Sequence, residues 1–299
     1  MTGDKMNKPS LRAPGILLVL AAALATTATP GDSRPVAAAS PPAATYADLA
    51  DLADGAPVVI RAQPRKIAAV EPARARGLRP GWGRFYVEAK TEALIAGSAP
   101  LGEALRYLVD LPLDTKGKPP TFKKKSVVLF ARSFPGRPGE LQLVAPDAQL
   151  LWDIALGARI KGVLRELLAS GAAPRISGVR EAVHVTGDLA GAGETQIFLL
   201  SASGEPAAIT VSRQPGAAPH WGVSYSELVA SDQTPVRDTL GWYRLACFLP
   251  PELPAAANVS DDLADRAAAA QDYAYARDQL GVCARSRRGA PSPIDPDWP

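Results

Sequence analysis

The stretch Arg84–Ile95 reads RFYVEAKTEALI and alternates between apolar and polar side chains. One face would hold Phe85, Val87, Ala89, Thr91, Ala93 and Ile95, and the other Arg84, Tyr86, Glu88, Lys90 and Glu92. Successive side chains on a β-strand point to opposite faces of the sheet, so this pattern predicts a long strand with one buried face.

Four further segments around this strand also have strand character. They are Val58–Val70, Leu105–Leu113, Val127–Ala131 and Leu141–Val144. Turns rich in Gly and Pro separate them, and no convincing helical pattern lies between them. Five such strands with a long first pair predict a closed antiparallel barrel, either OB-like or SH3-like. We assign this barrel to residues 46–146, where Tyr46–Leu52 adds one or two helical turns.

Residues 147–283 are predicted to form an α+β domain. Asp147 is expected to cap a helix that ends before Gly171 and is weakened in its middle by two glycines. This helix would cover an antiparallel meander of four strands, Ile176–Val185, Thr195–Ser201, Ala207–Arg213 and His220–Leu228. The protein as a whole is therefore expected to be a β-rich α+β protein.

Two more segments complete this second domain. Residues 240–249 are apolar and aromatic, and they fit a helix or a last strand equally well. An Ala-rich helix is expected to begin near Ser260 and to end about Leu280, before Gly281. Residues 284–299 are predicted to be a disordered tail.

The amino terminus has the order of an export signal. Basic residues precede an apolar stretch, residues 13–25, which is shorter than the ~20 residues of a permanent transmembrane helix. We predict a signal peptide cleaved after Ala28, with Ala39 as the other cleavage site and a retained anchor as the alternative. Residues 29–45 would be a flexible Pro- and Ala-rich linker. The mature chain is then expected in the periplasm or the medium, with no permanent transmembrane segment.

Export also changes how the two cysteines are interpreted. An oxidising compartment favours a disulfide between Cys247 and Cys283, which would tie the C-terminal helix back to the chain. Two buried free thiols are the alternative.

Basic residues are concentrated in the first predicted domain. Residues 57–140 contain 16 Lys and Arg against 7 Asp and Glu, whereas residues 141–299 contain 13 against 18. Aromatic residues lie among the cations, which is typical of platforms for anionic polymers. The candidate ligand-binding residues are Trp82, Arg84, Tyr86, Lys123, Lys124 and Lys125. The alternatives are a solvated surface, a complement to the acidic half and, for the lysines, protection of the next strand from aggregation.

Motifs for catalysis, metals and cofactors are absent from the sequence. It has no G-x-S-x-G elbow, no H-E-x-x-H and no glycine-rich phosphate or nucleotide motif, so no catalytic, metal-binding or cofactor residue is assigned. A hydrolase site would have to be assembled by folding, from His184 or His220 with Ser224, Ser226 or a carboxylate.

We therefore expect an exported, non-catalytic binding or envelope-associated module. Its partner would be an anionic envelope glycan or another protein, and export argues against nucleic acid. Two alternatives stay open, namely a periplasmic hydrolase with a site between the domains and a structural or assembly protein.

Overall fold

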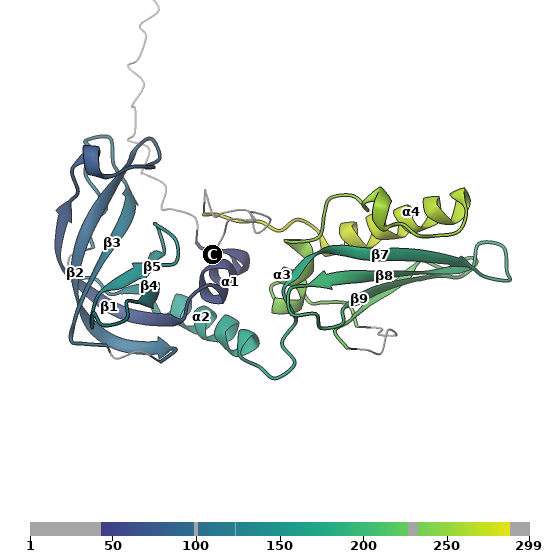
Figure 1. The fold of residues 1–299 in the computed structure, drawn as a ribbon, viewed down its shortest axis with the longest axis horizontal. Coiled ribbons are helices and arrows are strands. Elements are labelled where there is room, and N and C mark those ends of the chain that lie inside the picture. The colour runs from purple at the N-terminus through teal and green to yellow at the C-terminus, as the bar shows by residue number, and fades with distance from the viewer. Residues whose placement is uncertain (1–42, 99–100, 123, 227–232, 288–299) are drawn as a thin grey trace, which may run out of the picture. The chain divides into compact units, whose positions relative to one another are not determined.

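The computed structural model describes residues 43–98, 101–122, 124–226 and 233–287. The predicted signal peptide, both cleavage sites and Lys123 lie outside these ranges. The described residues belong to one compact unit and form a β-rich α+β fold with antiparallel sheets, as predicted (Figure 1). The division into a barrel domain and an α+β domain stays a prediction.

The first helix, α1 (Tyr46–Asp54), begins with a capping box. The Thr45 hydroxyl accepts the Asp48 backbone N–H, and the Asp48 carboxylate accepts the Thr45 backbone N–H. These bonds satisfy N–H groups that the first helical turn leaves without partners. Leu49 and Leu52 are buried on the same helix.

The first sheet contains all five predicted strands and one more. Its strands are β1 (Val58–Ala69), β2 (Trp82–Ala96), β3 (Ala104–Pro112), β4 (Val127–Ser133), β5 (Leu141–Leu143) and β6 (Gln149–Leu151). The order is β3-β2-β1-β4-β5, and β6 pairs with β4. Phe85, Val87 and Ala89 of β2 are buried, which is the face that alternation predicted.

The closed barrel is not confirmed. The sheet is an open path that ends at β3 and β5. Within the described ranges, these ends meet at an isolated bridge between Arg106 and Glu140 and at a hydrogen bond from the Arg106 N–H to the Gly139 carbonyl. Closure needs a continuous ladder between the terminal strands, and β5 offers three residues against the nine of β3.

Helix α2 (Ile154–Leu167) begins later than predicted. Asp147 does not cap it, because the residues that follow form β6. Asp153 is the cap, and its carboxylate accepts a backbone N–H of the first turn at 2.7 Å. The helix is also unbroken at Gly157, where the indole ring of Trp152 lies so close that an added Cβ would be 2.3 Å from it. This glycine permits close packing and does not interrupt the helix.

The second sheet is the predicted meander. Its strands, in the order β10-β9-β8-β7, are β7 (Ile176–Thr186), β8 (Gly193–Ser201), β9 (Ala208–Arg213) and β10 (His220–Ser224). The helix on this sheet is α4 (Leu263–Leu280), not α2 as predicted (Figure 1). Helix α2 instead packs against α1 and α3 (Leu240–Ala246), so residues 240–246 are helical. Two short 3-10 turns, η1 (Pro72–Arg74) and η2 (Ala255–Ala257), complete the elements.

The predicted disulfide is confirmed. Cys247, the C-cap of α3, is bonded to Cys283, just after α4. This bond is compatible with an extracytoplasmic location. Among the helices of the described ranges, none has both the length and the apolarity that a membrane crossing requires.

Candidate functional site

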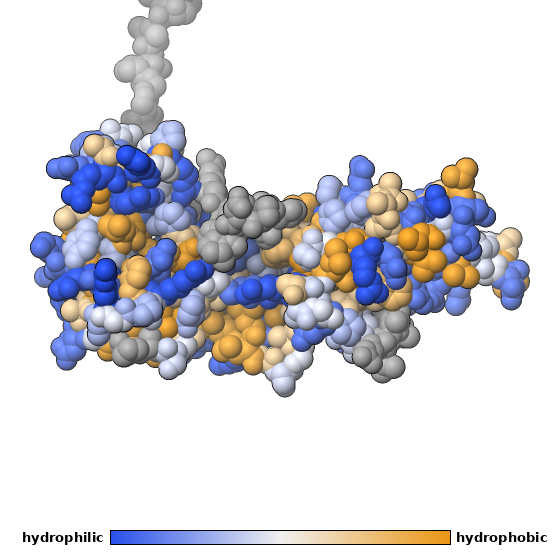
Figure 2. Space-filling model, in the orientation of Figure 1, coloured by the Kyte–Doolittle hydropathy of each residue, from blue (hydrophilic) through white to orange (hydrophobic). Residues whose placement is uncertain are grey.

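One face of β2 carries three of the predicted ligand-binding residues, which are Trp82, Arg84 and Tyr86. We call the side chains of Trp82, Arg84, Tyr86, Glu88 and Lys90, with their direct neighbours on β1 and β3, the outer face of β2. On β2 itself, Trp82, Arg84, Tyr86, Glu88 and Lys90 are partly or fully exposed, whereas Phe85, Val87 and Ala89 between them are buried. Figure 2 shows mainly hydrophilic residues with isolated apolar ones on the visible surface of β1–β3.

Arg84 is tied to the neighbouring strand. Its Nε and Nη2 donate to the two carboxylate oxygens of Asp110 at 2.7 and 2.9 Å, and the two residues are direct cross-strand partners. The hydrogen bonds to Asp110 raise the pKa of Arg84. A bidentate pair of this kind has a fixed geometry. Because the Asp110 carboxylate neutralises the guanidinium, Arg84 contributes little net positive charge to the surface.

The middle of the outer face of β2 is apolar. Tyr86 lies directly across from Leu108 of β3 and Ala68 of β1. Leu108 is 49% exposed. Tyr86 and Leu108 therefore form a short apolar row between two charged rows.

Cations dominate the next row. Glu88 lies across from Arg106 and Lys66, and the Lys66 ammonium is 3.6 Å from the Glu88 carboxylate. These groups are well exposed to water, so this ion pair adds little to stability. One carboxylate thus faces two cations in this row.

The row beyond lies beside Lys124, one of the three predicted lysines. Lys90 is the cross-strand partner of Gln63, whose side-chain amide donates to the Lys124 carbonyl at 3.1 Å. Directly paired residues project to the same face of a sheet, so Lys124 lies beside the Lys90 end of the outer face of β2. Lys124 and Lys125 are exposed, and Lys123 is outside the described residues.

The opposite end of this face is joined to the C-terminal part of the chain. The Arg79 guanidinium lies 3.9 Å from the ring centroid of Trp82, which is a close cation–π contact. The Asp147 carboxylate accepts from Arg79 at 3.3 Å and from Arg287 at 2.5 Å. Asp147 therefore links the turn before β2 to the end of the described chain.

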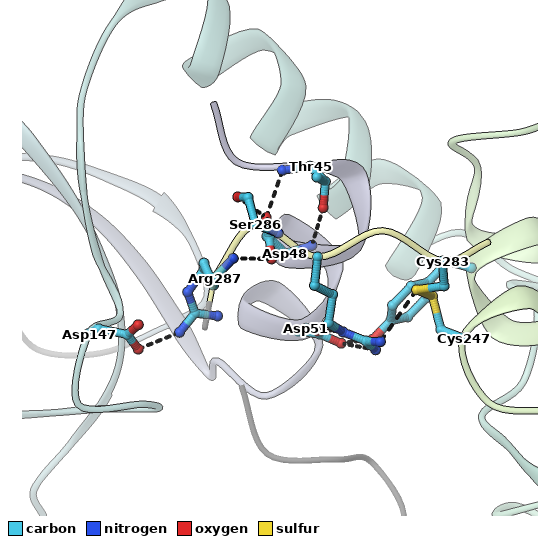
Figure 3. A network of polar contacts seen from close by, with 10 residues as sticks. Thr45, Asp48, Asp51, Asp147, Cys247, Cys283, Ser286 and Arg287 are labelled. Carbon is cyan, nitrogen blue, oxygen red and sulfur yellow. Dashed lines mark hydrogen bonds and ion pairs between the residues drawn. A yellow bond between two sulfur atoms is a disulfide. The ribbon is translucent and has the colours of Figure 1, made fainter. Parts of the chain in front are cut away.

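Residues 283–287, which we call the C-terminal strap, lie against α1 (Figure 3). The fully buried Asp48 carboxylate accepts the N–H and hydroxyl of Ser286, at 3.0 and 2.6 Å, and the N–H of Arg287 at 3.1 Å. Arg285 donates to Asp51 at 2.7 Å. Burial of Asp48 raises its pKa, but these hydrogen bonds and the one from Thr45 outweigh burial and hold the pKa below its ordinary value. The first residues of the predicted tail are thus fastened to the fold.

A buried polar network that the sequence analysis missed lies between α4 and the second sheet. The Nδ1 atom of His184 is 2.8 Å from the Thr195 hydroxyl, and this hydroxyl donates to the Asp272 carboxylate at 2.5 Å. The Arg213 guanidinium donates to the same carboxylate. The three residues His184, Thr195 and Asp272 are 7%, 0% and 0% exposed. A histidine, a hydroxyl and a carboxylate resemble hydrolase chemistry, but here they are enclosed and hold α4 on its sheet.

A sequence signal for this network does exist. Thr195 has the same strand parity as Ile197 and Leu199, which are buried, so it is a polar residue on an apolar face. Asp272 likewise lies three residues after Ala269 and four before Ala276, both buried on α4. Polar residues on two apolar faces that pack together indicate a shared buried interaction.

The serines of the hydrolase alternative are not near the buried histidine. Ser224 and Ser226 are 3.1 Å apart through their hydroxyls and lie at the end of β10. Three strand spacings separate β10 from β7, which carries His184, or about 14 Å. His220 is exposed at the other end of β10.

A shallow hollow lies on the second sheet, away from this network. It measures about 440 Å³ and is lined by Arg180, Phe198, Glu205 and Ser226, among others. The Arg180 guanidinium is 5.3 Å from the centroid of the Phe198 ring. These side chains are suited to polar recognition and include no histidine.

Two comparisons with known proteins found no match to this chain. No protein-family model matches it. No curated protein matches it either. Within the described residues, no group of three or more His, Cys, Asp or Glu side chains is arranged to hold a metal ion.

Proposed function

We propose that this chain is an exported, non-catalytic binding protein that holds an extended anionic polymer, such as an acidic envelope glycan, on the outer face of β2. The observation that carries the proposal is the arrangement of that face. An aromatic and apolar row lies between the balanced Arg84–Asp110 pair and rows that carry an excess of cations, and the lysine-bearing segment after β3 adjoins the cationic end.

The charges of this face favour an anionic partner. It holds two carboxylates, Asp110 and Glu88, and four cations, Arg84, Arg106, Lys66 and Lys90, and the backbone of Lys124 adjoins its Lys90 end. Guanidinium and ammonium groups bind carboxylate and phosphate oxygens. The excess of cations lies toward Lys90, because Asp110 balances Arg84 at the other end.

The shape of the face favours a polymer over a small molecule. Eight residue steps separate Trp82 from Lys90, which at the rise of a β-strand is about 27 Å. Tyr86 and Leu108 provide an apolar surface in the middle, against which the C–H face of a sugar ring can pack. No deep cavity is needed for such a partner.

We further infer that the first sheet is a partly open barrel of the OB type. The order β3-β2-β1-β4-β5, with β3 and β5 as neighbouring ends, agrees with that topology. In OB folds the face around the second and third strands binds oligosaccharides or oligonucleotides. This support is an analogy of fold, and the residues named above carry the specific argument.

Binding of the exported chain to polygalacturonate, with neutral dextran as the comparison polymer, tests the proposal. We expect binding to the acidic polymer alone and a fall in affinity as salt rises. Lys90→Glu with Lys124→Glu should weaken binding at least tenfold. The matched control, Lys161→Glu with Arg165→Glu on the exposed side of α2, makes the same change in net charge and should retain the affinity. Equal losses in both variants, or no binding by the unmodified chain, would refute the proposal.

The same samples address the hydrolase alternative. We expect no new reducing ends to form when the protein is incubated with the polymer. Steady release of reducing ends, lost on His184→Ala in a folded variant, would favour the hydrolase.

A further inference from the structure

A hollow lies between helices α1 and α2, and it is separate from the outer face of β2. It measures about 290 Å³, and its lining includes Tyr46, Arg159, Gly162, Glu166 and Asp238. The two helices pack against each other (Figure 1), and Asp238 comes from the turn before α3. The volume is close to the lower end of the range for small-molecule sites. Binding in this hollow is therefore independent of the proposed function.

Three charged residues line the hollow. The Arg159 guanidinium donates to a backbone carbonyl just before α1 at 2.6 Å, which uses one of its five N–H groups. The Oε2 atom of Glu166 accepts two hydrogen bonds, from the Tyr46 hydroxyl at 3.0 Å and from the first backbone N–H of α3 at 2.5 Å, so its Oε1 atom is left for a ligand. Asp238 is exposed. The hollow thus offers one cation and two anions.

Tyr46 holds one of these carboxylates in place and adds an aromatic ring. Burial raises the pKa of Tyr46, and the charges of Glu166 and Asp238 raise it further. The hydroxyl therefore stays neutral and donates to Glu166. An ammonium group beside a carboxylate and an aromatic ring gains both an ion pair and a cation–π attraction. This side of the hollow is therefore suited to an ammonium group.

Gly162 keeps the hollow open. It lies in the interior of α2, where a glycine weakens the helix. Gly157 on the same helix is explained by packing, because Trp152 leaves no room for a Cβ there, but a Cβ at Gly162 would meet no atom within 4 Å. Arg159 lies three residues before Gly162 and Glu166 four residues after it, so the three share one side of the helix. The two charged residues are offset by about 10 Å along the helix axis, with the bare glycine between them.

We propose that this hollow binds a free α,ω-diamino acid such as lysine, with its carboxylate on Arg159 and its two ammonium groups on Glu166 and Asp238. One carboxylate and two ammonium groups match the guanidinium and the two carboxylates of the site charge for charge. The aliphatic stem of the ligand covers Gly162 and the buried side chain of Leu49, which also lines the hollow. An acidic ligand is disfavoured, because it places like charges against Glu166 and Asp238.

Isothermal titration calorimetry of the exported chain with L-lysine tests the class of ligand. We expect saturable binding of a single molecule per chain. Two comparison compounds each lack one charged group, since 1,5-diaminopentane has no carboxylate and norleucine has no terminal ammonium. Each should bind about tenfold more weakly or worse, because a charge-assisted hydrogen bond is lost. Failure of L-lysine to bind, or an equal affinity for either comparison compound, would overturn the proposal.

Substitutions on α2 test the position of the site. Gly162→Leu fills the hollow and should abolish binding of L-lysine. Its matched control, Ala158→Leu, enlarges an exposed residue of the same helix and should keep the affinity. Arg159→Gln should weaken binding about tenfold through the loss of the guanidinium charge. Unchanged affinity in Gly162→Leu, or equal losses in the two leucine variants, would place the ligand elsewhere and contradict the proposal.

A charge variant tests the site without changing its shape. Asp238→Asn should weaken binding of L-lysine about three- to tenfold, because an exposed ion pair contributes only modestly. The control Asp188→Asn removes an exposed carboxylate elsewhere and should have no effect; equal effects of the two changes would count against the site. Binding of polygalacturonate should be the same in Gly162→Leu as in the unmodified chain, so this proposal and the proposed function can fail separately.

Discussion

Replacement of both cysteines, Cys247→Ser with Cys283→Ser, removes a covalent link across a sequence separation of 36. In the chain-entropy model a loop of this length stabilises the folded state by about 4 kcal/mol, because it restricts the unfolded chain. For a protein of this size each kcal/mol shifts the melting temperature by about 2–4 °C. We therefore expect the variant to melt roughly 8–16 °C below the oxidised protein.

The variant should still fold at room temperature. Helix α4 lies within the closed loop, and the bond from Thr195 to Asp272 and the burial of Tyr273 hold it on the second sheet without the disulfide. The C-terminal strap loses its covalent anchor, so the amide protons of Ser286 and Arg287 should exchange faster with solvent.

Differential scanning calorimetry with and without reductant measures this effect. Reductant should lower the melting temperature of the unmodified protein to that of the variant and should leave the variant unchanged. A difference below about 3 °C between the oxidised protein and the variant would refute the reasoning. It would mean that the unfolded chain is already restricted, or that the bond distorts the folded state.

Three further predictions concern stability. The pKa of Asp48 in the folded protein is held below its ordinary value of 3.8. The ionised Asp48 carboxylate therefore stabilises the fold fully above pH 3.8, and this stabilisation is lost as the pH falls through the pKa of the folded state. In acid titrations followed by circular dichroism, Asp48→Asn should reduce the loss of stability below pH 3.8. Asp272→Ala should lower the free energy of unfolding, measured in urea, by about 3 kcal/mol, because the buried Thr195 hydroxyl and the Arg213 guanidinium lose their shared acceptor. A loss below about 1 kcal/mol would contradict a stabilising role for Asp272. On α2, Gly157→Ala should destabilise the protein by about 1–3 kcal/mol, since the new Cβ would clash with Trp152. In Gly162→Ala the new Cβ meets no atom within 4 Å, so this change should stabilise the protein by up to about 1 kcal/mol. Equal effects of the two changes in thermal melts would refute the comparison.

Strands were predictable because their signal is local. The alternation of Arg84–Ile95 reports which face of β2 is buried, and the same reasoning located the other four strands of the first sheet and the meander. The disulfide was predictable because the sequence has only two cysteines and its amino terminus predicts export to an oxidising compartment. Each of these inferences needs only neighbouring residues or composition.

The errors arose where distant pairing overrides local preference. Residues 149–151 suit a helix, but they pair with β4 as β6, so the helix starts at Ile154 and not after Asp147. Two helices also compete to cover the meander. The more apolar one, α2, packs elsewhere, and α4 takes the position, where Tyr273 is buried and Asp272 meets Thr195 and Arg213.

The candidate site divides in the same way. The sequence by itself determined that Trp82, Arg84 and Tyr86 share one face of a strand, because β-strand alternation is a property of the backbone. Only the tertiary structure decided that Arg84 is balanced by Asp110, that Lys124 adjoins Lys90 and that Arg287 shares Asp147 with Arg79. Those residues are tens to hundreds of positions apart in sequence, and the free energy that brings them together comes from burying the core, not from any preference of the residues themselves.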